Sequence, residues 1–108
     1  MRPVSVPVTL AELPGQIERF GNTPYLLTVG ADASPRATSV RVAWQGRFLT
    51  TGAGTRTAAN IRENDAIVLL WPAVEPGEHA LIVDARAEVQ GQDVYIQPAK
   101  AVLHVTRH

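Results

Sequence analysis

The sequence predicts a mainly β domain, a closed or half-closed barrel of about six to seven antiparallel strands with two short helices. Apolar residues recur at every second position along most of the 108-residue chain, which is the period of a half-buried strand. The expected strands are joined by short turns rich in Gly, Pro and Asp. No repeat or linker divides the chain, so residues 1–108 are expected to form one domain.

The N-terminal segment is expected to hold an extended arm followed by the first helix. Residues 1–8 alternate valine with proline and serine, which predicts an arm that lies at most along a sheet edge. Thr9 and Glu12 have capping-box spacing, and Gly21 is placed to end the helix. Pro14 is awkward inside a helix, so the helix begins either near Leu10 or at Pro14. The apolar stripe of this helix comprises Leu10, Leu13, Ile17 and Phe20.

From residue 25 onward the pattern is that of strands. The segment 36–44 has no purely apolar face, so part of it is expected to meet a ligand or a partner. The run 66–71 is apolar without alternation, which predicts burial on both sides. Pro98 is expected to interrupt the last strand, since it cannot donate a ladder hydrogen bond. The expected strands are 25–30, 36–44, 47–51, 66–71, 79–90, 93–97 and 101–107, with a loop at 72–78.

The stretch L-T-T-G-A-G-T-R-T-A-A-N, residues 49–60, combines a strand, two glycines and a helix start near Thr55. Glycines let a ligand approach the backbone, and a helix N-terminus offers unpaired N–H groups to an anion. Thr51, Thr55 and Thr57 supply hydroxyls, and Arg56 supplies a forked charge. The stretch fits a phosphate site, although neither a P-loop nor a dinucleotide fingerprint. An ordinary connection, with Thr55 as the N-cap and Arg56 solvated, fits the same residues.

Composition narrows the classes of partner. Lys plus Arg and Asp plus Glu both number 10, so nothing draws the chain to nucleic acid or to an anionic membrane. The absence of cysteine excludes disulfides and thiolate chemistry, and the three histidines lack ligand spacing, so no metal site is expected. No apolar run approaches the ~18 residues of a membrane span, and no signal peptide opens the chain, so a cytoplasmic protein is expected. With 19% charged residues, some apolar surface is expected to be covered in a homodimer.

The chain resembles the pyridoxamine 5′-phosphate oxidase-like split-barrel family, which binds flavins. The resemblance is carried, in order, by Y-L-L-T-V-G-A-D-A-S-P-R, T-S-V-R-V-A-W, F-L-T-T-G-A-G-T-R-T-A-A-N-I-R-E-N, A-I-V-L-L-W-P, L-I-V-D-A-R-A-E-V and A-V-L-H. It implies a split β-barrel homodimer with two equivalent flavin sites at the subunit interface. The cofactor would be FMN or the deazaflavin F420.

The resemblance also implies the cofactor-binding residues. They are Thr38, Ser39, Val40, Arg41, Thr50, Thr51, Thr55, Arg56 and Thr57. Family oxidases usually carry an arginine where Thr38 stands and a lysine where Thr57 stands. FMN binding is therefore weaker, uses Arg36, Arg41 or Arg56 instead, or has been lost. The chain also stops before the substrate-binding extension of true oxidases, so pyridoxamine phosphate oxidation is not expected.

The leading interpretation is a small flavin-binding, oxidoreductase-like protein that passes hydride or electrons to an unknown small molecule. No residue is assigned as a catalytic acid or base. The alternatives are a non-catalytic flavin- or haem-binding module, with His79 and His104 as the realistic haem ligands, or a cofactor-free split-barrel dimer. Trp44 and Trp71 are expected to serve core or dimer packing rather than stacking on a cofactor ring.

Overall fold

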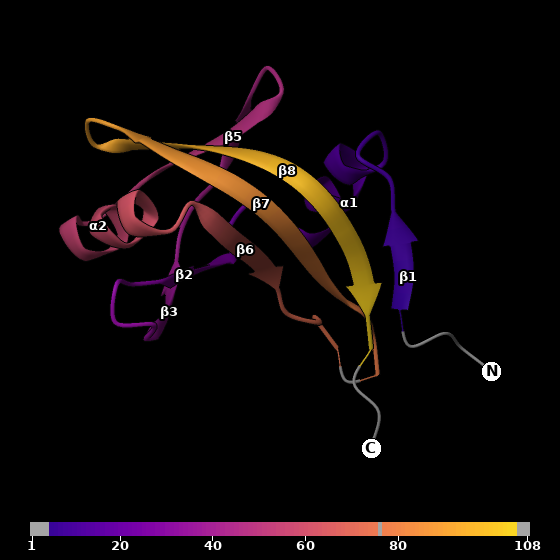
Figure 1. Ribbon diagram of the computed structural model, residues 1–108. Helices are drawn as coiled ribbons and strands as arrows, with labels where there is room; N and C mark the ends of the chain where they lie inside the picture. The colour runs from indigo at the N-terminus through magenta and orange to yellow at the C-terminus, as the bar shows by residue number, and fades with distance from the viewer. Residues whose placement is uncertain (1–4, 76, 106–108) are drawn as a thin grey trace.

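The computed structural model describes residues 5–75 and 77–105 (Figure 1). This part of the chain forms one eight-stranded sheet, antiparallel at every pairing, and two helices. The elements are β1 (Ser5–Val8), α1 (Leu13–Phe20), β2 (Tyr25–Val29), β3 (Pro35–Ser39), β4 (Ala43–Gln45), β5 (Phe48–Gly52), α2 (Thr55–Glu63), β6 (Ala66–Trp71), β7 (Ala80–Gln90) and β8 (Asp93–His104). The sheet order is β3-β2-β6-β7-β8-β5-β4, with β1 beside β8. The predicted mainly β class is confirmed.

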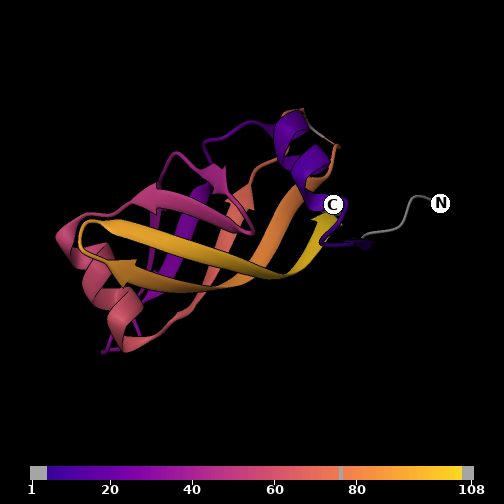
Figure 2. The same cartoon turned by 90° about the horizontal axis from the view of Figure 1, so that it is seen from above.

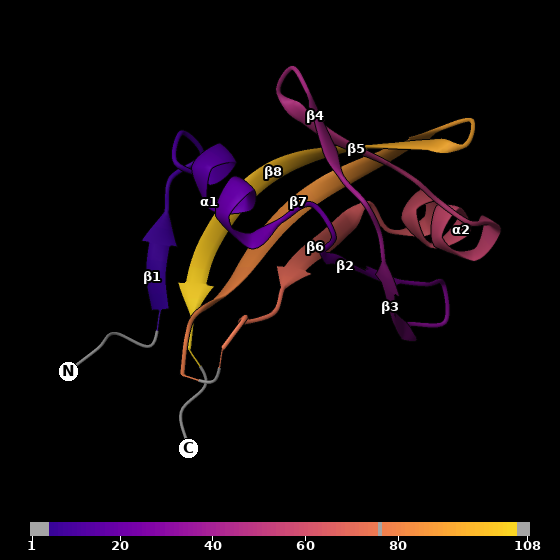
Figure 3. The same cartoon turned by 180° about the vertical axis from the view of Figure 1, so that it is seen from behind.

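The barrel closes through a bend between β3 and β4. The prediction of one strand over 36–44 was wrong, because β3 pairs with β2 whereas β4 pairs with β5 at the opposite edge of the sheet. Between them, the Val40 N–H donates to the Pro24 carbonyl at 3.0 Å and the Val42 N–H donates to the Asn22 carbonyl at 2.8 Å. The chain therefore bends where it changes hydrogen-bonding partner, and it joins the two sheet edges (Figure 3).

The long strands β7 and β8 pair along their length and form the curved centre of the sheet. Pro98 does not interrupt β8, contrary to the prediction. Asp84 pairs with Lys100 and Ala85 pairs with Pro98, so Ala99 is the extra residue of a bulge. The second edge of β8 pairs with β5 over 93–96 and with β1 over 101–104. Pro98 lies between these two ladders, so its missing N–H removes no hydrogen bond to β5 or to β1.

The apolar core lies inside the barrel. Eight of its side chains are at most 1% exposed: Leu13, Leu26, Leu49, Leu69, Leu81, Val83, Val94 and Ile96. The two helices lie at opposite ends of the barrel (Figure 2). Leu13 and Ile17 of α1 are buried in the same core at one end. Ile61 of α2 is buried in it from the other end.

The apolar run of β6 is covered on only one side by the described chain. Ile67, Leu69 and Trp71 are buried, whereas Val68 and Leu70 on the outer face are half-buried. The expectation of burial on both sides is therefore not met within one chain. The sheet is a single layer here, and α1 and α2 lie at its ends rather than over this face.

The N-terminal predictions are confirmed in part. Strand β1 pairs along β8 as the arm was expected to do, while residues 1–4 lie outside the described residues. Thr9 and Glu12 exchange capping-box hydrogen bonds of 3.0 and 3.2 Å, but these close a turn that precedes α1. The bond from the Thr9 N–H holds the pKa of the Glu12 carboxyl below its usual range. Pro14 is the second helical residue, and Gly21 ends the helix with φ of 99°.

Parts of two other predicted segments lie outside the described residues. Pro76 in the predicted 72–78 loop is not among the described residues, nor are residues 106–107 of the predicted last strand. Neither described helix is long and apolar enough to cross a lipid bilayer.

One side-chain hydrogen bond ties β6 to the end of α1. The indole N–H of Trp71 donates to the Gly21 carbonyl at 2.8 Å, and the Trp71 side chain is almost fully buried. Because Gly21 is the cap of α1, this bond sets where the helix stops against the barrel. The packing predicted for Trp71 is confirmed.

We expect Trp71→Phe to lower the free energy of unfolding by about 1–3 kcal/mol, because the substitution removes this donor and loses part of the indole packing. Chemical denaturation measures the change. Trp44→Phe is the matched control, since Trp44 is 38% exposed and its indole makes no described hydrogen bond. Equal losses in the two variants would show that the Trp71–Gly21 bond contributes nothing specific.

Candidate functional site

The connection from β5 to α2 leaves the start of the helix open. Gly54 is the N-cap, with φ of −70° and ψ of 170°, so the interpretation of Thr55 as the N-cap was wrong. No side chain caps this end of α2. A Cβ built on Gly54 would meet no atom within 4 Å. The uncapped first turn of α2 therefore adjoins open space at Gly54, and its N–H groups and the positive end of the helix dipole suit an anion.

The four threonines predicted on β5 and α2 do not all reach that space. Thr57 and Thr51 are buried, at 4% and 8% exposure. The Thr50 hydroxyl donates to the Ala43 carbonyl at 3.3 Å, which joins β5 to β4. Thr55 is exposed, as is Arg56 beside it. The groups that can meet a ligand at the helix start are thus Thr55, Arg56 and the backbone.

Contacts on the inner side hold α2 in place. The Asn60 amide donates to the Thr28 hydroxyl at 3.1 Å. A Cβ on Gly30 would lie only 2.8 Å from the Asn60 Oδ1 atom, so the helix sits directly against β2 at that glycine. The Ala53 N–H donates to the Gln92 carbonyl at 3.3 Å and ties the loop to the β7–β8 turn. Asn60 therefore packs the helix against the end of β2.

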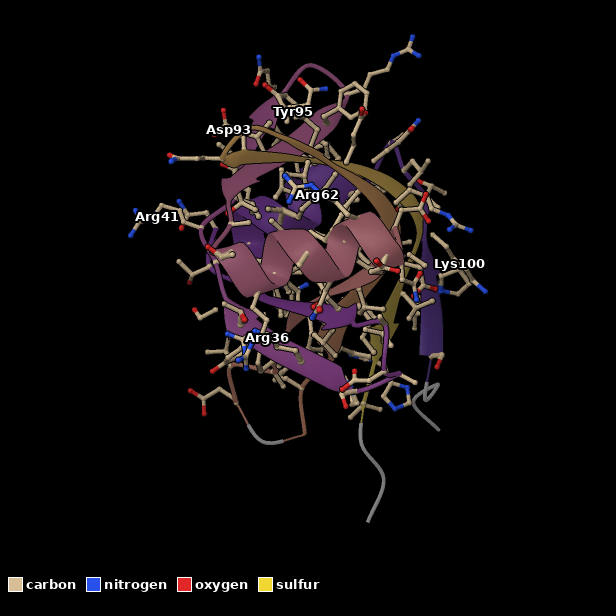
Figure 4. The ribbon with its side chains drawn as sticks, turned by 60° about the vertical axis from the view of Figure 1, so that its left-hand side comes forward. Arg36, Arg41, Arg62, Asp93, Tyr95 and Lys100 are labelled. Carbon is tan, nitrogen blue, oxygen red and sulfur yellow. The ribbon has the colours of Figure 1, made fainter. Side chains whose placement is uncertain are left out.

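The second group of predicted residues lies at the end of β3 and in the bend. Ser39 and Arg41 are exposed, while Thr38 and Val40 are half-buried. Figure 4 shows Arg41 extending away from the barrel and Arg36 lying on the opposite side of α2 from Tyr95. Among the described residues, Arg36, Arg41 and Arg56 form no ion pair, which leaves all three guanidinium groups for an anionic ligand.

A cavity of about 410 Å³ between α2 and the β7–β8 ribbon was not predicted. It is lined by Phe48, Ile61, Arg62, Asp65, Arg86, Ala87, Glu88, Val89, Tyr95 and Gln97, none of which is a predicted site residue. Arg86 and Asp65 form an exposed ion pair of 2.6 Å at its wall. Figure 4 shows Arg62 pointing from α2 towards the strands that carry Tyr95. No local motif marks this cavity, because the long β7–β8 pairing brings its walls together.

The two histidines line cavities of different size, and the cavity that His104 lines, about 590 Å³, is large enough for a small molecule. His104 Nδ1 is hydrogen-bonded to the Ser5 hydroxyl at 3.1 Å. His79 Nε2 is buried without a hydrogen-bond partner, but the cavity beside it is about 200 Å³. Small-molecule sites typically occupy ~300–1,000 Å³. The described residues also contain no cluster of three or more His, Asp or Glu side chains suited to a metal ion.

Comparison with known proteins identifies the fold. No protein-family model and no curated protein sequence matches the chain. A proposed pyridoxamine 5′-phosphate oxidase from Listeria innocua has a TM-score of 0.70 at 17% identity, over 87% of this chain and 96% of that one. The haem storage protein HutZ from Vibrio cholerae scores 0.68 at 14% identity, over 90% and 95%. An F420 reductase scores 0.62 at 16% identity, over 74% and 88%.

These structures share the fold that the sequence resemblance implied. The chain has the split-barrel fold of these solved structures. Strands β3 and β5, the bend after β3 and helix α2 are the elements on which the resemblance placed a cofactor.

We expect Gly30→Ala to destabilise the protein by about 1–3 kcal/mol, because the new methyl group overlaps Asn60 and displaces it from Thr28. Thermal and denaturant unfolding measure the loss. Gly15→Ala is the control, since a Cβ there meets no atom within 4 Å and alanine favours the helix. The two substitutions should act with opposite sign; a stable Gly30→Ala protein would mean that α2 is free to shift on β2.

Proposed function

We propose that this split-barrel chain forms a homodimer that binds a flavin-type cofactor, FMN or F420, with the cofactor phosphate at the start of α2. The observation that carries the proposal is the uncapped helix start with open space above Gly54 and an unpaired Arg56 beside it. The fold supports the proposal, since one protein of the same fold is an F420 reductase and another is a proposed pyridoxamine 5′-phosphate oxidase.

The residues present suit a phosphate better than a neutral group. The first-turn N–H groups of α2 donate to anions, and the Thr55 hydroxyl extends that set of donors. Arg56 supplies a charge-assisted bond, roughly twice as strong as a neutral one. Thr57 stands where the resemblance implies a lysine, and Arg56 is the cation nearest in sequence to the helix start.

The ring of the cofactor is assigned to the strands next to this helix. Thr50 on β5 and Val40 in the bend lie on the barrel wall that leads to α2. The exposed Ser39 and Arg41 offer a hydroxyl and a charge at its border. A bound flavin would supply the hydride or electron transfer, while these side chains would bind and orient it.

An apolar face on the outside of the sheet supports the homodimer. The register places Tyr25 opposite Leu70, Leu70 opposite Ile82, and Ile82 opposite Val102, so these side chains share one face. Leu27 and Val68 form the next row of this outer apolar face. Tyr25 is 44% exposed and the other members are half-buried.

A continuous apolar surface of this kind marks a protein contact. Ser39 pairs with Tyr25 at the border of the outer apolar face. A second copy seated on the face would therefore lie beside the end of β3, and the proposed cofactor position would come close to the dimer interface. That arrangement agrees with the interface site that the resemblance implied.

We expect Arg56→Ala to weaken FMN or F420 binding at least about ten-fold, from the ~1.5–3 kcal/mol of a charged hydrogen bond. The measurement is a fluorescence titration of each cofactor side by side. Arg62→Ala on the same helix is the control, because Arg62 points away towards the β7–β8 strands. If the wild type binds and Arg56→Ala binds equally well, the phosphate does not lie at the start of α2. If the wild type binds neither cofactor, the flavin proposal is contradicted.

We expect light scattering to give a dimer mass for the wild type and a monomer mass for Leu70→Glu, because a charge in the middle of the outer apolar face cannot be buried unpaired. Leu10→Glu is the matched control, since Leu10 is 51% exposed and lines a cavity that shares no residue with the cavity beside Leu70. A monomeric wild type at working concentration would overturn the dimer.

A further inference from the structure

Two adjoining cavities flank Trp44 between α1 and the β4–β5 hairpin. Their volumes are about 480 and 530 Å³, and Trp44 and Pro14 line both. We call this feature the Trp44 groove. Its further lining residues are Leu10, Leu13, Gly46, Arg47, Gln97 and Pro98 on one side, and Ile17, Glu18, Gly21, Asn22, Val42, Ala43 and Leu49 on the other.

The groove has the size and surface of a small-molecule site. Each cavity falls within the ~300–1,000 Å³ of typical ligand pockets, and the lining is mainly apolar with a few polar groups. Trp44 is 38% exposed and Leu10 is 51% exposed, although both have buried apolar neighbours such as Leu13. An exposed indole presents a flat face on which a second aromatic ring stacks. The shape and composition of the groove favour a ligand with a planar apolar ring system.

The charged residues of the groove indicate where an anionic group of the ligand would bind. Arg47, in the β4–β5 turn, forms no ion pair among the described residues, and Gln97 shares its cavity. A guanidinium group binds a carboxylate through two parallel N–H bonds. Glu18 borders the other cavity and disfavours an anion there. The anionic end of a ligand is therefore directed to Arg47.

We propose that the Trp44 groove binds a flat aromatic carboxylate, with its ring against Trp44 and its carboxylate on Arg47. The site does not depend on the proposed flavin, because its walls come entirely from the one described chain. It nevertheless lies next to the strands assigned to the cofactor ring. Ala43 lines the groove and its carbonyl accepts the hydroxyl of Thr50.

The test is a titration of flavin-free protein with 2-naphthoate, followed through the two tryptophan indole N–H signals in an NMR spectrum. We expect the Trp44 signal to shift saturably and more than that of Trp71, which is buried and bonded to Gly21. For a ligand of this size the dissociation constant should be on the order of 1 mM or lower. The amide 2-naphthamide, which has the same ring without the charge, should bind about ten-fold more weakly.

Two variants locate the site. Arg47→Ala should weaken naphthoate about ten-fold and leave naphthamide unchanged, whereas Arg62→Ala should change neither. Trp44→Leu should weaken both ligands, and its unfolding transition shows whether it is folded. Failure of the wild type to bind naphthoate, or equal binding by Arg47→Ala, overturns the proposal. A Trp44 signal that changes on dilution but not with naphthoate also overturns it, because a second copy would then cover the groove.

Discussion

The change of hydrogen-bonding partner along residues 35–45 is the constraint on which the rest of the structure depends. β3 can pair only with β2 and β4 only with β5 because these strands lie at opposite edges of one sheet. The connecting bend is held by backbone hydrogen bonds to Pro24 and Asn22. Through this bend the chain passes from one edge strand of the sheet to the other. Without that bend the edges would separate, and the side chains now inside the barrel would meet water.

Once the barrel is closed, its two ends have different roles. Helix α1 closes one end with Leu13 and Ile17, and the Trp71 indole bonds its C-terminal cap, Gly21. Helix α2 is held to β2 through Asn60, with its first turn directed into open space. The end closed by α1 therefore contributes buried apolar side chains to the core. The end occupied by α2 carries the free dipole and the unpaired Arg56, which is why an anionic cofactor is assigned there.

Apolar surface remains uncovered in two places, and the two differ in shape. The outer apolar face of β2, β6, β7 and β8 belongs to a sheet, which suits the broad surface of a second copy. The surface around Trp44 is hollowed between a helix and a hairpin, and Arg47 lies at its edge, which suits a small ligand. The low charge content of the sequence pointed to covered apolar surface without saying where it lies or what covers it.

The sequence by itself determined which segments are strands or helices, because alternation, glycines and caps are local signals. It placed the start of α2 at Thr55 and the end of α1 at Gly21, as observed. Only the tertiary structure decided that β8 passes through Pro98, that 36–44 bends into two strands, and that Thr51 and Thr57 are buried. Each of those outcomes depends on which strand or helix, distant in sequence, packs beside the residue. The local sequence around the residue does not specify that element.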